Sequence, residues 1–271
     1  MCTLVIDIRP DDDWPVVLAG NRDEMSDRPW QAPARHWPDR PEVRAGLDEL
    51  AEGSWFAVAD HGVVATILNR RGTLGPAHNK RSRGELVLDA VEYGSAQEAA
   101  EAMAHLDPEA YRGFNLIIAD PKGAYCLSHR SLSHQGSSVG EGEAISVQAI
   151  PPGTHLIDAM DLDDANSPRV QRWLPQFATA PRPSDELASW QAWIDLLAAQ
   201  APLDTNAPDQ VQQARASMKV DLPMQDGSNR RFATVCSQLL AIPKYPGFSG
   251  GLPFWFAAGA PGEASYEPVA K

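Results

Sequence analysis

The sequence has few cysteines, and their scarcity excludes several kinds of protein. The three that it has are an odd number with no CxxC spacing, at Cys2, Cys126 and Cys236. Disulfide frameworks, zinc ribbons and c-type haem attachment all need paired or closely spaced cysteines. The seven histidines are scattered and form no HxxxH pair with a supporting acid. We therefore expect no disulfide, no metal ion and no cofactor.

Long apolar runs and basic charge are also scarce. No stretch approaches the roughly 18 apolar residues of a membrane span, and the acidic first residues do not resemble a secretory signal. Acidic residues outnumber basic ones, 36 to 23, for a net charge of −13. Because phosphate contacts need clustered Lys and Arg, we expect no nucleic-acid partner. We expect a cytoplasmic protein of unknown oligomeric state, whose basic segment 70–83 is either an anion site or a solvated loop.

The order of the periodic segments predicts an α+β fold. Alternating β-branched segments predict strands, and amphipathic segments predict helices. The expected strands are 2–9, 16–20, 53–60, 63–69, 114–119, 124–129, 144–149, 154–157, 232–242, 253–258 and 265–269. The expected helices are 82–92, 95–105, 167–177 and 186–200, the first with a capping box of Ser82 and Glu85, and 27–50 is expected to be a long loop. Strands joined by hairpins, with helices in separate blocks, favour antiparallel sheets covered by helices.

A cysteine at position 2 is the first chemical signal. Its small side chain permits removal of Met1, which would leave a thiol and a free α-amine on Cys2. The amine titrates near about 7.7–8.0, so a useful fraction is neutral at cellular pH. A neutral amine can take the proton of the thiol, so that one residue supplies both nucleophile and base. A Met-Cys start alone is more often without catalytic meaning.

The residues that follow the second expected strand strengthen this interpretation. Asn21, Arg22, Asp23 and Glu24 lie at the end of a strand expected to pair with that of Cys2. A cation such as Arg22 favours a thiolate, and Asp23 can orient the amine. Acyl transfer also needs hydrogen-bond donors for an oxyanion, and the side chain of Asn69, at the end of a hairpin strand, is a candidate. The competing explanations are a solvated charged turn for residues 21–24 and a turn-forming role for Asn69.

Taken together, these residues resemble the NRDE family, the group related to transport and Golgi organisation protein 2. The resemblance begins with Met1-Cys2-Thr3 and the Asn-Arg-Asp-Glu tetrapeptide at 21–24. It continues in order through the following stretches: Glu52-Gly53-Ser54-Trp55, Leu68-Asn69-Arg70-Arg71, Arg81-Ser82-Arg83-Gly84-Glu85, Gly113-Phe114-Asn115-Leu116, Asp161-Leu162-Asp163-Asp164, Ser167-Pro168-Arg169-Val170, and Arg231 before Thr234-Val235. The resemblance covers nearly the whole chain.

That family is similar to N-terminal-nucleophile (Ntn) hydrolases of the choloylglycine hydrolase and penicillin acylase type. The resemblance implies one domain, 2–271, with an Ntn-hydrolase-like αββα four-layer sandwich of two antiparallel sheets. It implies Cys2 as nucleophile, Arg22 as partner of the thiolate and Asp23 as orienter of the amine. It further implies Asn69 as oxyanion donor and Arg231 as a second cation near the thiol, although the adjacent Arg230 could serve instead.

One position departs from the family pattern. Ala159 stands where the family usually carries an Asn, shortly before the Asp-Leu-Asp-Asp stretch. Loss of one oxyanion donor costs on the order of 100-fold in turnover. Asn166 lies nearby in the sequence, but nothing in the sequence shows that it substitutes.

Two functions remain open at this level. The first is an N-terminal-cysteine hydrolase (an amidase) or acyltransferase that acts on a non-peptide amide or thioester of a small molecule through a Cys2 acyl-enzyme. The alternative is a protein on the same scaffold that binds and traffics haem, acyl-CoA or another apolar ligand with little or no turnover. A protein whose Cys2 merely packs is a third possibility, to which Ala159 gives weight.

Overall fold

The structure is a computed structural model of the whole chain. It describes residues 2–75, 77–130, 144–202, 214–224, 228–244 and 252–270. The chain divides into two compact units. The first unit comprises 1–28 and 152–270, and the second comprises 29–151. That residues 2–271 act as one domain stays a prediction.

The first unit contains a seven-stranded sheet in the order β10-β1-β2-β12-β13-β14, with β11 also paired to β12. All of its paired strands are antiparallel. Its strands are β1 (Thr3–Ile8), β2 (Val16–Met25), β10 (Gly153–Ile157), β11 (Asp221–Pro223), β12 (Arg231–Ile242), β13 (Phe254–Ala257) and β14 (Tyr266–Pro268). The short turn between β1 and β2 makes them a hairpin, so the residue before β1 lies beside the far part of β2.

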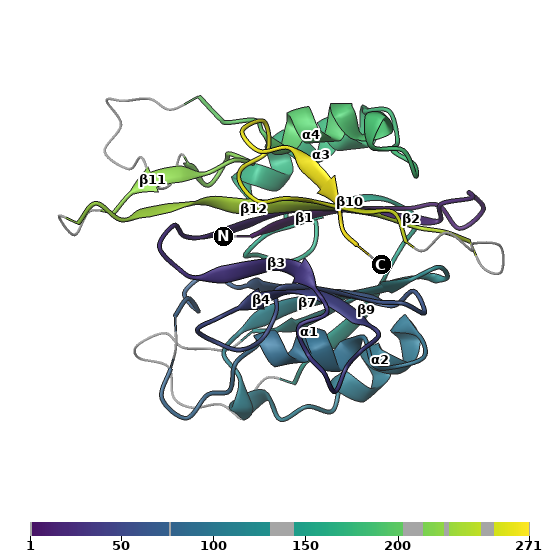
Figure 1. Cartoon of the computed structure of the whole chain (residues 1–271), viewed down its shortest axis with the longest axis vertical. Helices are drawn as coiled ribbons and strands as arrows, with labels where there is room; N and C mark the ends of the chain where they lie inside the picture. The colour runs from purple at the N-terminus through teal and green to yellow at the C-terminus, as the bar shows by residue number, and fades with distance from the viewer. Residues whose placement is uncertain are drawn as a thin grey trace. The chain divides into compact units, whose positions relative to one another are not determined.

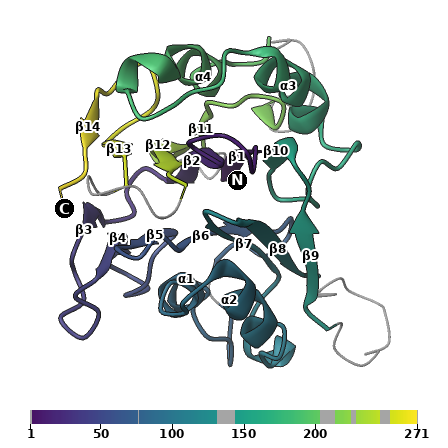
Figure 2. The same ribbon diagram turned by 90° about the vertical axis from the view of Figure 1, so that its right-hand side faces the viewer.

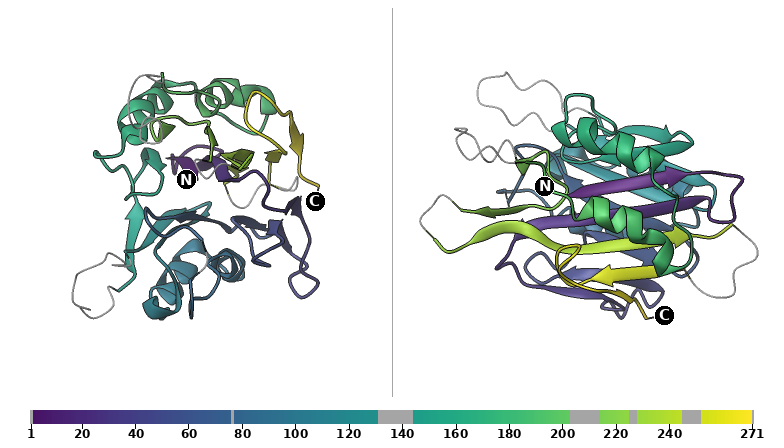
Figure 3. Two further views of the ribbon diagram at one scale, coloured as in Figure 1. Left: turned by 90° about the vertical axis from the view of Figure 1, so that its left-hand side faces the viewer. Right: turned by 90° about the horizontal axis from the view of Figure 1, so that it is seen from above.

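Helices α3 (Pro168–Thr179) and α4 (Gln191–Leu197) lie over one face of this sheet, as Figures 1 and 3 show. Ser167 caps α3 by accepting a hydrogen bond from the amide of Val170, and Pro168 fits the first turn, where no amide donor is needed. The apolar face of α3 packs with Trp190 and Trp193 against side chains of β1, β2 and β12. This core fixes where the first turn of α3 meets the strands.

The second unit contains a seven-stranded antiparallel sheet in the order β3-β4-β5-β6-β7-β8-β9. Its strands are β3 (Trp30–Ala34), β4 (Val43–Asp48), β5 (Phe56–Ala59), β6 (Val64–Asn69), β7 (Phe114–Asp120), β8 (Gly123–His129) and β9 (Ser146–Ile150). Figure 2 shows α1 (Gly84–Ala90) and α2 (Ala96–Met103) on one face of this sheet, where they bury a second apolar core. In neither unit does a described helix have the length and apolar character needed to cross a membrane.

Most expected elements are confirmed, and the exceptions are the following. The expected loop 27–50 was wrong, because it contains β3 and β4. The capping box at Ser82 was also wrong: α1 begins at Gly84 after Arg83, whose side chain makes no cap, and the Ser82 hydroxyl instead accepts from the amide of Gly84, at 3.2 Å. The expected helix 186–200 is a 3-10 turn, Leu187–Trp190, followed by the short α4. Strand β11 has no counterpart among the expected elements.

The carboxylate of Asp7 on β1 makes the stability of the first unit depend on pH. The buried carboxylate accepts a hydrogen bond from Thr154 at 2.6 Å and pairs with Arg182. Burial by itself would raise the pKa of Asp7, but the bonds from Thr154 and Arg182 outweigh it, and the pKa lies below its ordinary 3.8. A depressed carboxyl pKa stabilises the fold above the unfolded value, and this contribution is lost as pH falls through the folded value.

We expect Asp7→Asn to lower the free energy of unfolding by about 2 kcal/mol at pH 7, because charged hydrogen bonds are lost. The difference from wild type should narrow as pH falls below about 4. Urea unfolding at a series of pH values measures both effects. Asp12→Asn, at a half-exposed partner of the same Arg182, is the control and should change little. A difference that stays constant down to pH 2.5 would contradict the assignment.

Candidate active site

Cys2 directly precedes β1 and is half-buried. Thr3 faces Asn21 across β1 and β2, so the next pair along the hairpin is Cys2 with Arg22. The Sγ atom of Cys2 donates a long hydrogen bond of 3.9 Å to the backbone oxygen of Asp23. The hairpin therefore brings Cys2, Arg22 and Asp23 together, as the sequence predicts.

A second thiol lies in the same row of residues. Arg22 faces Cys236 on the neighbouring strand β12, beside a bulge in the register. Side chains of directly opposed residues in antiparallel strands share one face. Arg22 therefore has a cysteine on each side, and its charge lowers the pKa of both thiols in part. Cys126, on β8 of the second unit, is buried and has Ser128 beside it.

Burial decides the protonation state of the Cys2 thiol. Desolvation raises its pKa above the ordinary 9.0, and the negative charge of Asp23 raises it further. The positive charge of the chain's N-terminus, the hydrogen bond to the backbone of Asp23 and the charge of Arg22 lower this pKa, in that order, but the net change is upward. Arg22 therefore acts in the expected direction without producing a standing thiolate. A proton acceptor has to take the proton of the thiol when it reacts.

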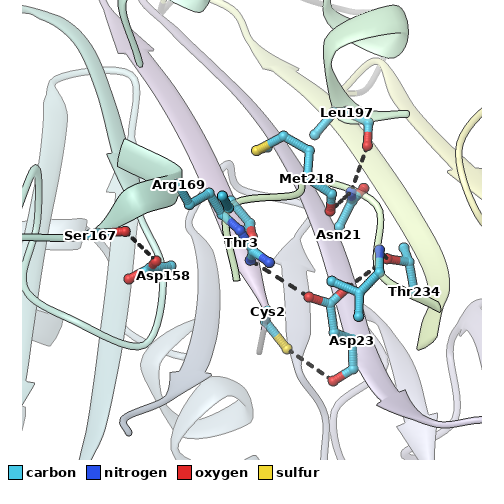
Figure 4. A network of polar contacts seen from close by, with 12 residues as sticks. Cys2, Thr3, Asn21, Asp23, Asp158, Ser167, Arg169, Leu197, Met218 and Thr234 are labelled. Carbon is cyan, nitrogen blue, oxygen red and sulfur yellow. Dashed lines mark hydrogen bonds and ion pairs between the residues drawn. The ribbon is translucent and has the colours of Figure 1, made fainter. Parts of the chain in front are cut away.

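The carboxylate of Asp23 is fully buried and held from two sides (Figure 4). Thr234 of β12 donates a hydrogen bond of 2.7 Å to Oδ1. Arg169 of α3, also fully buried, places Nη1 3.6 Å from Oδ2 and hydrogen-bonds the hydroxyl of Thr3. The amide of Val220 in turn donates to the Thr234 hydroxyl at 2.9 Å. Asp23 is thus a fixed, paired charge and not a solvated turn residue.

Further polar contacts fix the strands around this carboxylate. The side-chain amide of Asn21 donates to the backbone oxygens of Leu197 and Met218, each at 3.0 Å. Ser167, the cap of α3, donates a hydrogen bond of 2.7 Å to Asp158, just after β10. The network in Figure 4 therefore ties the first turn of α3 to the ends of β10, β1 and β2.

Asn69, the expected oxyanion donor, is the last residue of β6 in the second unit. It faces Phe114 of β7 and is half-buried. Its position at the end of a hairpin strand is as the sequence predicts. Its role stays a prediction.

The two expected basic candidates at the start of β12, Arg231 and the preceding Arg230, are paired elsewhere. Arg231 is exposed, and its Nε lies 2.5 Å from Asp221. Arg230 is also exposed and pairs with Asp27 at 2.9 Å. Arg231 precedes Cys236 by five residues of β12, about 16 Å along an extended strand. We therefore leave both arginines out of the candidate site.

Ala159 follows the end of β10 and is buried. Because β10 runs antiparallel to β1, this end of β10 lies beside the start of β1, where Cys2 is. A methyl group thus occupies the position expected for an amide donor. The amide of Asn166 is bonded to Asp164 at 3.0 Å and is exposed, so this side chain already has a local structural partner.

Arginines of the basic segment 70–83 form hydrogen bonds within the segment and to residues 113–115. Arg70 donates to Asn115 at 2.6 Å, and Arg83 donates to Thr73 and to the backbone of Gly113. Arg112, from outside the segment, donates to three backbone oxygens of the loop. These contacts favour a structural role over an anion site. Within the described ranges, no cluster of three or more His, Cys, Asp or Glu could hold a metal ion.

Sequence reasoning identified Cys2, Arg22 and Asp23 but missed Arg169, Thr234 and Thr3 as parts of the same network. Arg169 lies 166 residues after Thr3, and although Thr3, Arg169 and Thr234 all lie in stretches that carry the family resemblance, that resemblance assigned them no role. A charged residue in the first turn of a helix is normally read as solvated. Only the packing of α3 on the sheet reveals that this one points inward.

Hydrolases are among the solved structures with a similar fold. An N-acylethanolamine-hydrolyzing acid amidase ortholog from Caenorhabditis elegans is 14% identical, with a TM-score of 0.50, covering 80% of this chain and 98% of that one. A variant of the conjugated bile acid hydrolase from Clostridium perfringens is 11% identical, also with a TM-score of 0.50, covering 99% and 92%. Identities this low show the fold alone. They confirm an Ntn-hydrolase-like α+β fold with two antiparallel sheets.

Curated relatives match a shorter part of the chain. The transport and Golgi organization protein 2 homolog of Bos taurus is 38% identical over 117 residues, and that of Homo sapiens is 34% identical over 110 residues. Each match covers 39% of this chain and spans only 38% of the relative. A model of the family described as Transport and Golgi organisation 2 matches residues 1–245. The chain therefore belongs to the transport and Golgi organisation 2 family.

Proposed function

We propose that this protein is an N-terminal-cysteine hydrolase or acyltransferase that acts on a non-peptide amide or thioester of a small molecule. The observation that carries the proposal is the position of Cys2, with its thiol on the backbone oxygen of Asp23 and Arg22 beside it. The solved neighbours are named as hydrolases of N-acylethanolamines and of conjugated bile acids, which supports a small acylated substrate. Removal of Met1 is part of the proposal.

The chemistry follows from the two groups that Cys2 then carries. The neutral α-amine accepts the thiol proton as sulfur attacks the carbonyl carbon, and a C–S bond forms. The C–N or C–S bond of the substrate breaks, and the amine returns the proton to the leaving group. Water or another acceptor then attacks the thioester, with the amine again as base, which releases the acyl product and restores the thiol. The raised pKa of the Cys2 thiol makes such a base necessary.

The proposal is tested by turnover of a panel of N-acyl amides and acyl thioesters with mature protein. Release of the free acid, or acyl transfer to an added amine, supports it. A protein that has lost Met1 yet turns over no member of the panel and forms no acyl adduct would count against it.

Asn69 should contribute to this turnover. We expect Asn69→Ala to lower turnover of a panel substrate about 100-fold, because one donor to the oxyanion is lost. In the same variant, the rate at which iodoacetamide alkylates Cys2 should change less than about twofold, since that reaction forms no oxyanion. Asn166→Ala is the matched control and should leave both rates near wild type, because its amide is exposed and bonded to Asp164. Equal turnover in wild type and Asn69→Ala would remove Asn69 from the site.

A further inference from the structure

Arg169 is a cation in a position that is costly by itself. It is the second residue of α3, and its side chain has no exposed surface. The N-terminal end of a helix carries partial positive charge, so a cation there is disfavoured. Burial of a charge adds a larger cost unless the charge is paired and hydrogen-bonded. Some other group in the fold must compensate for both costs.

Asp23 supplies that compensation. Nη1 of Arg169 lies 3.6 Å from Oδ2 of Asp23 and donates to the hydroxyl of Thr3. The other carboxylate oxygen accepts from Thr234 at 2.7 Å. The carboxylate therefore has a cation on one oxygen and a hydroxyl donor on the other, and its orientation is set from α3 and from β12.

The same contacts lead directly to the reacting residue (Figure 4). Thr3 is the chain neighbour of Cys2, and the backbone oxygen of Asp23 accepts from the Cys2 thiol. Among the described residues of the first unit, Arg22 on β2 and Cys236 on β12 are further charged or titratable groups that act on the Cys2 thiol or are acted on by it. Asp158, after β10, is bonded to Ser167 at the start of α3.

We infer that Arg169 is a positioning residue for Cys2, which acts by holding the carboxylate of Asp23 oriented beside the N-terminal residue. The inference rests on the proposed function, because it assigns a role in the same reaction. Arg169 is bonded to the hydroxyl of Thr3, the neighbour of Cys2, and Arg22 is opposite Cys2 in the hairpin, so both positive charges disfavour the ammonium form of the Cys2 amine. Without Arg169, the α-ammonium becomes the main compensating charge for Asp23, and less neutral amine is available as base.

The test is the rate of Cys2 alkylation by iodoacetamide as a function of pH. The reaction is carried out on mature full-length protein and is monitored by intact-mass spectrometry. In Arg169→Met, the inflection of the rate should move upward by about one pH unit relative to wild type, so that the rate below the inflection falls about tenfold. Arg169→Lys keeps the charge and should restore most of the wild-type profile. Arg172→Met is the matched control, since Arg172 lies on the same helix but is exposed.

The outcomes separate the inference from the proposed function. An upward shift in Arg169→Met, with near-normal profiles for Arg169→Lys and Arg172→Met, supports the role. A wild-type profile in Arg169→Met, or an equal loss in Arg169→Lys, overturns the inference and leaves the proposed function standing. A wild-type protein that retains Met1, or whose Cys2 does not react, overturns both.

A second variant keeps the test decisive where Arg169→Met does not fold. Thr3→Val preserves the shape of a buried strand residue and removes the hydroxyl that accepts from Arg169. Because the guanidinium of Arg169 is then held less firmly, the inflection should move upward by less than in Arg169→Met. The rate of Cys2 alkylation below the inflection should fall by up to about fivefold relative to wild type. An unchanged profile in folded Thr3→Val would overturn the inference.

Discussion

Replacing Cys2 by Ala is expected to abolish the acyl adduct and to lower turnover more than about 1,000-fold. The substitution removes the only atom that the proposed mechanism uses as nucleophile, while the fold keeps its packing because Cys2 precedes β1 and is only half-buried. Cys2→Ser should retain a small residual rate, because a hydroxyl is a weaker nucleophile than a thiol. Turnover of a panel substrate and the mass of the trapped adduct measure the effect.

The two remaining cysteines provide matched controls for this prediction. Cys126 and Cys236 are both buried in strands. Burial raises the pKa of Cys236, so that thiol is expected to stay protonated and inert. Cys126→Ala and Cys236→Ala should each keep most of the turnover and the single adduct. Full activity in Cys2→Ala, or loss of the adduct in Cys126→Ala, would contradict the assignment of the nucleophile.

Asp23→Asn is expected to lower the free energy of unfolding by about 3–5 kcal/mol. The substitution keeps the size of the side chain but leaves Arg169 as a buried charge without its carboxylate, and both side chains are fully buried. Breaking a buried pair from one side is costly because the remaining charge stays desolvated. Urea unfolding at pH 7 gives the difference directly.

Asp221→Asn is the matched control, because it removes the carboxylate of an Arg–Asp pair that is about half exposed on both sides. We expect Asp221→Asn to lower the free energy of unfolding by at most about 1 kcal/mol, as for other surface ion pairs. The double substitution Asp23→Asn with Arg169→Met should recover part of the loss, since no unpaired charge remains, and the double-mutant cycle isolates the coupling. Equal losses of unfolding free energy in Asp23→Asn and Asp221→Asn would contradict the claim that the buried Asp23–Arg169 pair is coupled more strongly than a surface ion pair.

The hairpin of β1 and β2 could be predicted because local rules all agree there. Alternating β-branched residues surround a short turn, and the register that follows places Arg22 and Asp23 near Cys2. Segment 27–50 misled the prediction because its Pro content indicates a loop. Pro33 is tolerated in β3 because this strand lies at the edge of its sheet and its register shifts between Gln31 and Ala34.

The parts of the site that the sequence did not reveal are those set by long-range packing. The inward direction of Arg169 depends on the register between α3 and the sheet, and that register is fixed by Trp and Phe contacts across the first core. Arg231 shows the opposite case. Its place before a long strand was predicted, but its partner Asp221 lies on β11, a three-residue strand that no periodicity could indicate.

The central claim is that Cys2 becomes a reactive N-terminal residue. Intact-mass and peptide mass spectrometry of the native protein, made without an N-terminal tag and treated with an activated acyl donor, test it most directly. We expect a chain that begins at Cys2, carrying one acyl group on the N-terminal peptide. Retention of Met1, or an acyl group found on Cys126 or Cys236 instead, would contradict the claim.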